Sequence, residues 1–168
     1  MPQFLIDLSR QRRYWLALFL LGFALEASAL YYQYALDEWP CVLCIHIRIA
    51  VFAFMLISLA GLFTTGSKIT TGLLQGLNTL SLAWMTERSY QVLAVERGWV
   101  FGDCDMELGA PDWFAIDQWI PSVFEVKTSC GYTPYILGQI TMAEVLMIMS
   151  VLLLALSLSL FVASWLDR

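Results

Sequence analysis

Four cysteines and one arginine are the residues of this chain whose types and spacing could do chemistry. Cys41 and Cys44 form a Cys-x-x-Cys pair, whereas Cys104 and Cys130 stand far apart in a more polar stretch. Arg48 completes an i, i+3, i+7 spacing with the first pair, so in a helix these three side chains share one face. A guanidinium one turn from a thiol can stabilise the thiolate, or bind an anionic or carbonyl ligand beside it. The pattern predicts dithiol–disulfide redox chemistry.

The Cys-x-x-Cys pair is a poor structural staple, because closing so short a loop adds little stability. Pro40 precedes the pair and suits a helix start, where a thiol pKa falls and the reactive thiolate is favoured. Of the three possible pairings, Cys41–Cys44 with Cys104–Cys130 follows most simply from the spacing. Two alternatives stay open, namely a pair of purely structural disulfides and a zinc site. The second pair lacks the close spacing of a zinc knuckle, so we expect no metal.

The elements that carry these residues must lie in a membrane. The chain has 168 residues, of which 60% are hydrophobic and 14% charged, whereas soluble domains have about 45–50% and about 25%. The same figures exclude disorder, which needs low hydrophobicity and high charge. The net charge of -5 argues against a nucleic-acid partner. Since the length suits one domain, we expect a single integral membrane domain over 1–168.

Four apolar runs are long enough to cross a bilayer core of about 30 Å, which needs about 20 helical residues. The predicted spans are 14–34, 41–63, 69–95 and 135–166, with a long loop at 96–134. The third run is interrupted by Gln75, Asn78, Ser81, Glu87 and Arg88. These polar side chains should face the other helices, because lipid cannot satisfy them. The sequence therefore predicts an all-α fold, a four-helix transmembrane bundle.

Basic residues predict the orientation of the spans, because cytoplasmic loops are enriched in lysine and arginine. One side carries Arg10, Arg12, Arg13, Lys68 and Arg168. Both termini are therefore expected in the cytoplasm, with the long acidic loop and all four cysteines on the outer side or at its boundary. Outside a bacterial inner membrane, disulfides are permitted. A cleaved signal peptide ending at Ala27-Ser28-Ala29 is an alternative, but the apolar run exceeds the about 7–15 residues of a signal core.

The segment 111–121 of the long loop is bounded by proline at both ends and is rich in aromatic residues. In a short helix, one broad apolar face would hold Trp113, Phe114, Ile116 and Ile120. Such a pattern is typical of an amphipathic helix that lies on the membrane surface. The alternative is an aromatic plug folded onto the loop itself.

Charged residues inside the spans gather in their outer halves. Arg48 lies about 10 Å below the outer end of its span at about 1.5 Å per residue, where an arginine costs at least about 2.5 kcal/mol. It is therefore a functional candidate, although snorkelling to the interface is an alternative. Glu26 lies at nearly the same depth, and we hypothesise an ion pair between the two. His46, two residues after Cys44, falls on another face and is interpreted as a polar neighbour rather than a catalyst.

The electrons released by a dithiol need an acceptor. The sequence has neither a glycine-rich phosphate loop nor a haem-binding Cys-x-x-Cys-His motif. A quinone dissolved in the bilayer would suit an apolar bundle, with Arg48 polarising its carbonyl oxygen beside Cys44. Thiol–disulfide exchange would then link the two cysteine pairs.

These residues resemble the signature of the DsbB family of disulfide bond formation proteins. The resemblance rests on Cys41-Val42-Leu43-Cys44-Ile45 followed by Arg48, on Cys104-Asp105, on Asp112-Trp113, on Asp117-Gln118-Trp119-Ile120-Pro121 and on Cys130. It covers about residues 15–142, and Glu26 in the first span matches too. The resemblance implies a four-helix bundle in the bacterial inner membrane, with a short horizontal helix in the second periplasmic loop and the redox cysteines periplasmic.

The resemblance also implies an electron route. Cys104–Cys130 would accept electrons from the periplasmic thiol oxidase DsbA, with Cys104 forming the mixed disulfide. Cys41–Cys44 would reoxidise that pair and pass the electrons to ubiquinone or menaquinone.

The same resemblance assigns the quinone contacts. Cys44 would lie next to the quinone, Arg48 would help bind it, and Met142 would line the same pocket. Two positions depart from the family pattern: Gln91 stands where members carry a histidine, and Ile47 where they carry an acidic residue.

Two other function classes compete with a quinone-linked thiol oxidase. One is another membrane thiol redox carrier, either a vitamin K epoxide reductase-like protein or an importer of thiol electrons. An importer would need cysteines within the membrane to carry electrons across, and the sequence has none there. The other is a disulfide-stapled scaffold, which the placement of Arg48 on the face of Cys44 disfavours.

Overall fold

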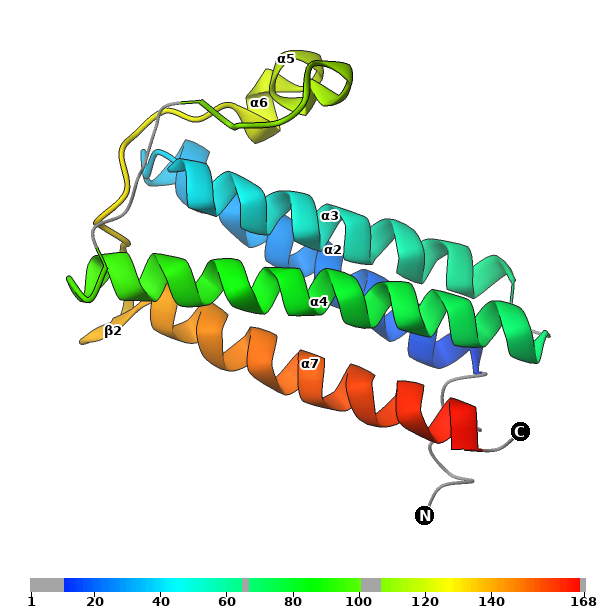
Figure 1. Ribbon diagram of the computed structural model, residues 1–168. Coiled ribbons are helices and arrows are strands. Elements are labelled where there is room, and N and C mark those ends of the chain that lie inside the picture. Colours follow the sequence, from blue (N-terminus) through cyan, green and yellow to red (C-terminus); the bar gives the residue numbers. More distant parts are fainter. Residues whose placement is uncertain (1–10, 65–66, 101–106, 167–168) are drawn as a thin grey trace.

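The computed structural model describes residues 11–64, 67–100 and 107–166. Four long helices dominate it: α2 (Arg12–Ala35), α3 (Val42–Phe63), α4 (Lys68–Glu96) and α7 (Met142–Leu166). They lie side by side, with α2 against α3, α3 against α4, and α4 against α7 (Figure 1). The first turn of α2 and the last turn of α7 lie at one end, and the long α4–α7 connection leaves from the other. Of the predicted site and orientation residues, Cys104, Arg10 and Arg168 fall outside the described ranges.

Three of these helices are long and apolar enough to cross a membrane, by length and composition: α2, α3 and α7 up to Ser164. The fourth, α4, is the longest at 29 residues but carries polar side chains along one face. Those side chains point inward as expected, since Gln75, Asn78 and Ser81 are all buried. The inward direction is therefore confirmed for these three side chains, whereas it is wrong for Glu87, which is exposed, and Arg88 is only half-buried.

Hydrogen bonds to neighbouring helices satisfy two of these three side chains. The Gln75 amide nitrogen donates to the Ser157 hydroxyl at 3.0 Å, and its oxygen accepts from the Tyr14 hydroxyl at 3.2 Å. The Ser81 hydroxyl donates to the Ala50 carbonyl at 2.9 Å. Asn78 differs, because both polar atoms of its buried amide lack a partner among the described residues. Polar contacts thus fasten α4 to α2, α3 and α7, since lipid-like surroundings offer no other partners.

Close packing of α2 against α3 depends on one glycine. The Trp15 side chain of α2 is fully buried and lies directly over Gly61 of α3, where an added Cβ would overlap its ring. The absence of a side chain at Gly61 therefore sets how closely the start of α2 and the end of α3 approach.

The fourth predicted span begins later than expected, and the fold is not purely helical. Residues 135–141 form a small antiparallel hairpin of β1 (Tyr135–Leu137) and β2 (Ile140–Thr141) ahead of α7. Gly138 adopts a left-handed φ of 58° in the turn, a conformation that disfavours helix and suits a tight reversal. The predicted start at Tyr135 is therefore wrong, and α7 begins at Met142.

The predicted single helix at 111–121 is also wrong. The chain instead forms three short pieces: the 3₁₀ turn η1 (Asp112–Phe114), α5 (Ile116–Trp119) and α6 (Pro121–Phe124). Non-helical ψ angles of 61° at Ala115 and 67° at Ile120 separate them. The predicted common face is split, because Ile116 is buried while Trp113 and Ile120 are 77% and 42% exposed.

Candidate active site

The dithiol lies at the first turn of α3. Cys41 is the N-cap residue, and its sulfur accepts a hydrogen bond from the Cys44 backbone N–H at 3.4 Å. The two sulfurs are 2.8 Å apart and both thiols are free. The helix N-terminus favours negative charge on a thiol placed there. The pair is therefore a dithiol whose sulfurs are close enough to form a bond upon oxidation.

Cys41 stands ahead of the candidate span, at the N-terminal end of α3. A hydrogen bond from the Cys44 side chain, assisted by backbone N–H groups, lowers the pKa of the Cys41 thiol to about 7, against the opposing effect of burial. Because the thiolate is the nucleophile, Cys41 is the stronger candidate of the two for exchange with another disulfide.

Arg48 lies about one turn below Cys44 on α3, and its guanidinium is buried, with 6% of the residue exposed. Nη1 donates to the Gln33 side-chain oxygen at 2.5 Å and to the Val123 carbonyl at 2.8 Å, while Nη2 donates to the Ala29 carbonyl at 3.0 Å. Three segments, namely α2, α3 and the end of α6, therefore meet at this charge. This buried arrangement does not fit the snorkelling alternative, in which the side chain of Arg48 would extend to the membrane interface.

The hypothesised ion pair between Glu26 and Arg48 is wrong. Salt bridges among the described residues do not include it, and Glu26 Oε1 is buried without a hydrogen-bond partner there. The Arg48 donors instead reach Gln33, which lies two helical turns closer to the C-terminal end of α2. The two charges still interact at longer range.

The returning limb of the long α4–α7 loop docks beside the dithiol. Backbone N–H groups of Lys127 and Thr128 donate to the Pro40 carbonyl at 3.0 and 3.3 Å, and Thr128 forms a parallel bridge with Cys41. Cys130, two residues further along, is disulfide-bonded. Its predicted partner Cys104 lies outside the described residues. The chain thus brings the Cys130 limb beside Cys41.

A second contact in this region joins the turn before α3 to the same loop. The Tyr132 hydroxyl donates to the Glu38 carboxylate at 3.5 Å. The negative charge of Glu38 raises the pKa of the exposed Tyr132 phenol.

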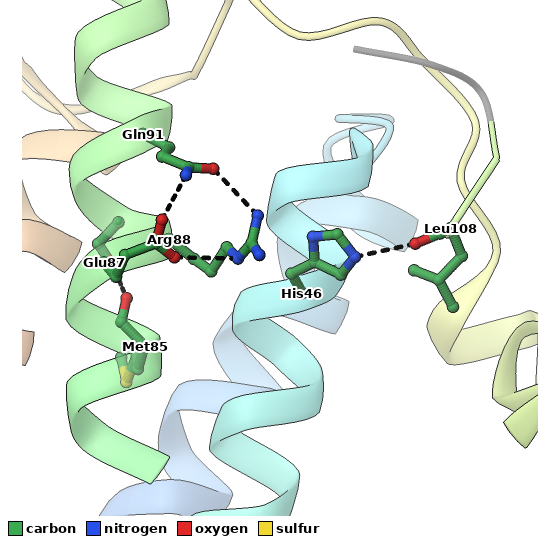
Figure 2. A network of polar contacts seen from close by, with 7 residues as sticks. His46, Met85, Glu87, Arg88, Gln91 and Leu108 are labelled. Carbon is green, nitrogen blue, oxygen red and sulfur yellow. Dashed lines mark hydrogen bonds and ion pairs between the residues drawn. The ribbon is translucent and has the colours of Figure 1, made fainter. Parts of the chain in front are cut away.

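The predicted pocket residue Met142 and the departing position Gln91 fall at different places in the fold. Met142 is the first residue of α7, which packs against α4, whereas Cys44 and Arg48 lie on α3. Its role in a quinone pocket stays a prediction. Gln91 sits in a polar cluster on α4, where it accepts from Arg88 at 3.1 Å and donates to Glu87 (Figure 2).

Sequence reasoning missed two polar residues of this region, Gln33 and Tyr34, and it missed the loop contact of His46. Gln33, which is 1% exposed, holds Arg48 and donates to the Ser122 carbonyl at 3.4 Å. Tyr34 donates to the same carbonyl at 2.6 Å. His46 Nε2 lies 3.0 Å from the Leu108 carbonyl. Each contact joins a helix to the distant loop, and no periodicity within one helix could have predicted them.

The fold and this dithiol site define a class: helical proteins with apolar spans that carry a reactive thiol pair at a helix N-terminus beside a disulfide-bearing loop. Comparison with known proteins gives the family. The family model for disulfide bond formation protein DsbB matches residues 11–160.

Individual relatives agree with that match. The chain is 33% identical over 141 residues to disulfide bond formation protein B of Shewanella denitrificans, covering 83% of this chain and 81% of the relative. It is 32% identical over 155 residues to the Shewanella amazonensis protein of that name, covering 91% and 92%. The Yersinia pestis protein is 33% identical over 136 residues, covering 78% and 74%.

The chain belongs to the DsbB family. It is a membrane thiol oxidase that acts in disulfide bond formation. This membership decides against the scaffold and the vitamin K epoxide reductase-like alternatives.

Proposed function

We propose that the protein oxidises a periplasmic DsbA-type dithiol and passes the electrons through Cys104–Cys130 and Cys41–Cys44 to a membrane quinone, ubiquinone or menaquinone. The observation that carries this proposal is the docking of the Cys130 limb on Cys41, through Thr128 and the Pro40 carbonyl. It explains how a pair in a loop can exchange with a pair at a helix end.

The first exchange transfers oxidation to the partner protein. One thiolate of the partner attacks Cys104, breaks the Cys104–Cys130 bond and releases Cys130 as a thiolate. The second partner thiol then attacks the mixed disulfide, which leaves the partner oxidised and Cys104 reduced. Two electrons and two protons have then moved to this chain.

The second exchange uses the docked limb. The Cys130 thiolate attacks Cys41 within an oxidised Cys41–Cys44 pair, and Cys44 leaves as a thiolate. Cys104 then attacks Cys130, which re-forms the outer disulfide and releases Cys41 with its electron pair. The lowered pKa of Cys41 makes it a good leaving group in this last step. The result is the α3 dithiol described above.

A bound quinone supplies the acceptor for two electrons and two protons as the Cys41–Cys44 bond re-forms. The donor set beside Cys44 fits such a group. A guanidinium has five N–H donors, and the hydrogen bonds of Arg48 to Gln33, Val123 and Ala29 leave Nε and one Nη2 proton without an acceptor among the described residues. Arg48 can therefore donate to a quinone carbonyl while the protein holds it in place.

We further propose that α4 is a fourth span and that both termini are cytoplasmic. The inward direction of the α4 polar side chains and their bonds to Tyr14, Ser157 and Ala50 support a place inside the bundle. The basic residues near the ends of the spans support the orientation. Exposed Trp113 and Trp119 suit a loop whose aromatic side chains rest on the outer membrane surface.

Quinone reduction by the purified protein tests the proposal. Reduced DsbA-type protein and either quinone are added, and quinol and partner disulfide are both counted. We expect one quinol per disulfide, no quinol with Cys44→Ser, and normal activity with the control Thr64→Ala at the far end of α3. Quinol formation that is absent with the unaltered protein, or undiminished in Cys44→Ser, would overturn it.

A further inference from the structure

The departing limb of the outer loop, residues 107–111, is fastened to the bundle at one polar point. The Leu108 carbonyl lies 3.0 Å from Nε2 of His46, on the second turn of α3 (Figure 2). The Leu108 side chain is buried at the same place. The returning limb, in contrast, is held by two backbone hydrogen bonds to Pro40.

Packing supports this limb from one side, where Leu108 lies in the hydrophobic core and Ala110 packs against it. A cleft of about 760 Å³ separates residues 107–111 from α5, α6 and the returning limb, and is lined by Glu107, Ala115, Gln118 and Val126 among others. An open cleft supplies no contacts to the side of the limb that faces it. The bond from His46 and the buried Leu108 side chain therefore hold the limb at its inner edge.

The polar groups near His46 leave its imidazole ring to hydrogen-bond with the Leu108 carbonyl. A carbonyl only accepts, so Nε2 must carry the proton and donate. On the other side, the charged groups of α4 bond to one another: Arg88 donates to Gln91 and pairs with Glu87 at 3.1 Å (Figure 2). The Trp84 ring lies 6.1 Å from the imidazole, centroid to centroid, and is tilted by 43° from its plane.

We propose that His46 is a positioning residue that holds the departing limb of the outer loop against α3, so that the loop meets a partner dithiol in a preformed arrangement. Its Nε2–H bond to the Leu108 carbonyl is the fastening. The functional part of this inference rests on the proposed oxidation of a protein dithiol.

The His46 bond matters because it shortens the stretch of chain between Cys104 and its nearest attachment to the helices. Leu108 follows Cys104 by four residues, a reach of at most about 14 Å. The bond adds to the apolar contacts of Leu108; if the limb detaches there, the next buried side chain among the described ones is Ile116, twelve residues from Cys104 and at most about 42 Å of extended chain. A longer tether lowers the effective concentration of the groups it carries and raises the ordering cost of docking. The KM for the partner protein should therefore rise, while reaction with the quinone should not change.

The unaltered protein offers the first test, because the sequence has one histidine. Nitrogen NMR of ¹⁵N-histidine-labelled protein in detergent then reports His46 alone. We expect the tautomer with the proton on Nε2 and slow exchange of that proton with water. A proton on Nδ1, or fast exchange, would overturn the inference whether or not any variant folds.

Variants provide the second test. His46→Leu removes the donor and keeps an apolar side chain, whereas His46→Gln retains an N–H that can reach a carbonyl. We expect amides of residues 107–110 to exchange with deuterium about 5- to 10-fold faster in His46→Leu, which corresponds to about 1–1.4 kcal/mol. His46→Gln and the neighbouring control Arg88→Gln should exchange like the unaltered protein.

Kinetics complete the test. In His46→Leu, the KM for the partner dithiol should rise several-fold while the KM for quinone stays constant, and His46→Gln should restore it. Equal exchange and equal KM in all variants, or equal loss in His46→Leu and His46→Gln, would overturn the positioning role. Failure of the quinone assay in the unaltered protein, with the NMR and exchange results as expected, would instead reject the proposed function alone.

Discussion

Gln33 controls the orientation of Arg48, and replacing it by leucine gives the sharpest test of the arginine site. Gln33 is fully enclosed between α2, α3 and α6, and its side-chain oxygen accepts from Arg48 at 2.5 Å. Leucine keeps a similar volume but cannot accept a hydrogen bond. The guanidinium then keeps only the Val123 and Ala29 carbonyls.

The expected loss follows from the bond that is removed. A hydrogen bond to a charged group contributes about 1.5–3 kcal/mol, and the 3.4 Å contact from Gln33 to Ser122 adds little. We therefore expect Gln33→Leu to lower the free energy of unfolding by about 1.5–3 kcal/mol. Poorer orientation of Arg48 should also weaken quinone binding. A weakening of about 0.7 kcal/mol raises the KM for quinone about threefold, since 1.4 kcal/mol corresponds to a factor of ten.

Tyr34→Phe is the matched control. Tyr34 neighbours Gln33 and donates to the same Ser122 carbonyl at 2.6 Å. Unlike Gln33, it is exposed, and the hydrogen bonds among the described residues include none between Tyr34 and Arg48. We expect it to cost about 1 kcal/mol or less and to leave the quinone KM unchanged. Denaturant unfolding in detergent and steady-state quinone reduction measure both quantities. Equal stability and equal KM in Gln33→Leu and Tyr34→Phe would refute the reasoning.

Three further predictions concern the packing and the thiols. Gly61→Ala should destabilise the fold by about 1–3 kcal/mol, because the new methyl overlaps the buried Trp15 ring; thermal unfolding unchanged from the unaltered protein would contradict this. Asn78→Leu should be neutral or stabilising, because it removes two buried polar atoms that lack partners among the described residues; a clear loss of stability would indicate an additional partner. Alkylation of Cys41 in the reduced protein should reach half its plateau rate near pH 7, since its pKa is lowered to about 7 by the bond from Cys44 and the thiolate dominates above that value. A midpoint at the ordinary thiol value of about 8.5 would contradict it.

The long helices were predictable because their signals are local. Apolar runs of about 20 residues predict α2 and α3 closely, and the polar residues of α4 had to face inward. The hairpin at 135–141 was not predictable from hydropathy, because its first strand, Tyr135–Leu137, is as apolar as a segment of a membrane-spanning helix. Its signal was Gly138, whose left-handed conformation reverses the chain.

The candidate site divides in the same way. The Cys41, Cys44 and Arg48 spacing lies within one helix and could be read directly from the sequence. The partners of Arg48 could not, because Val123 and Gln33 meet it only when the loop folds back over α3. A charge-pairing argument favoured Glu26, yet a neutral amide and two carbonyls satisfy the guanidinium instead.

The central claim is that electrons cross between the two pairs through Cys130 and Cys41. A protein with Cys44→Ser and Cys104→Ser retains only these two cysteines. After oxidation with diamide, proteolysis and mass spectrometry, we expect a Cys41–Cys130 disulfide, because Thr128 is paired with Cys41. The matched protein with Cys41→Ser and Cys104→Ser should form little Cys44–Cys130 bond. Free, alkylatable Cys41 and Cys130 in the first protein, or an equally abundant bond in the second, would contradict the account.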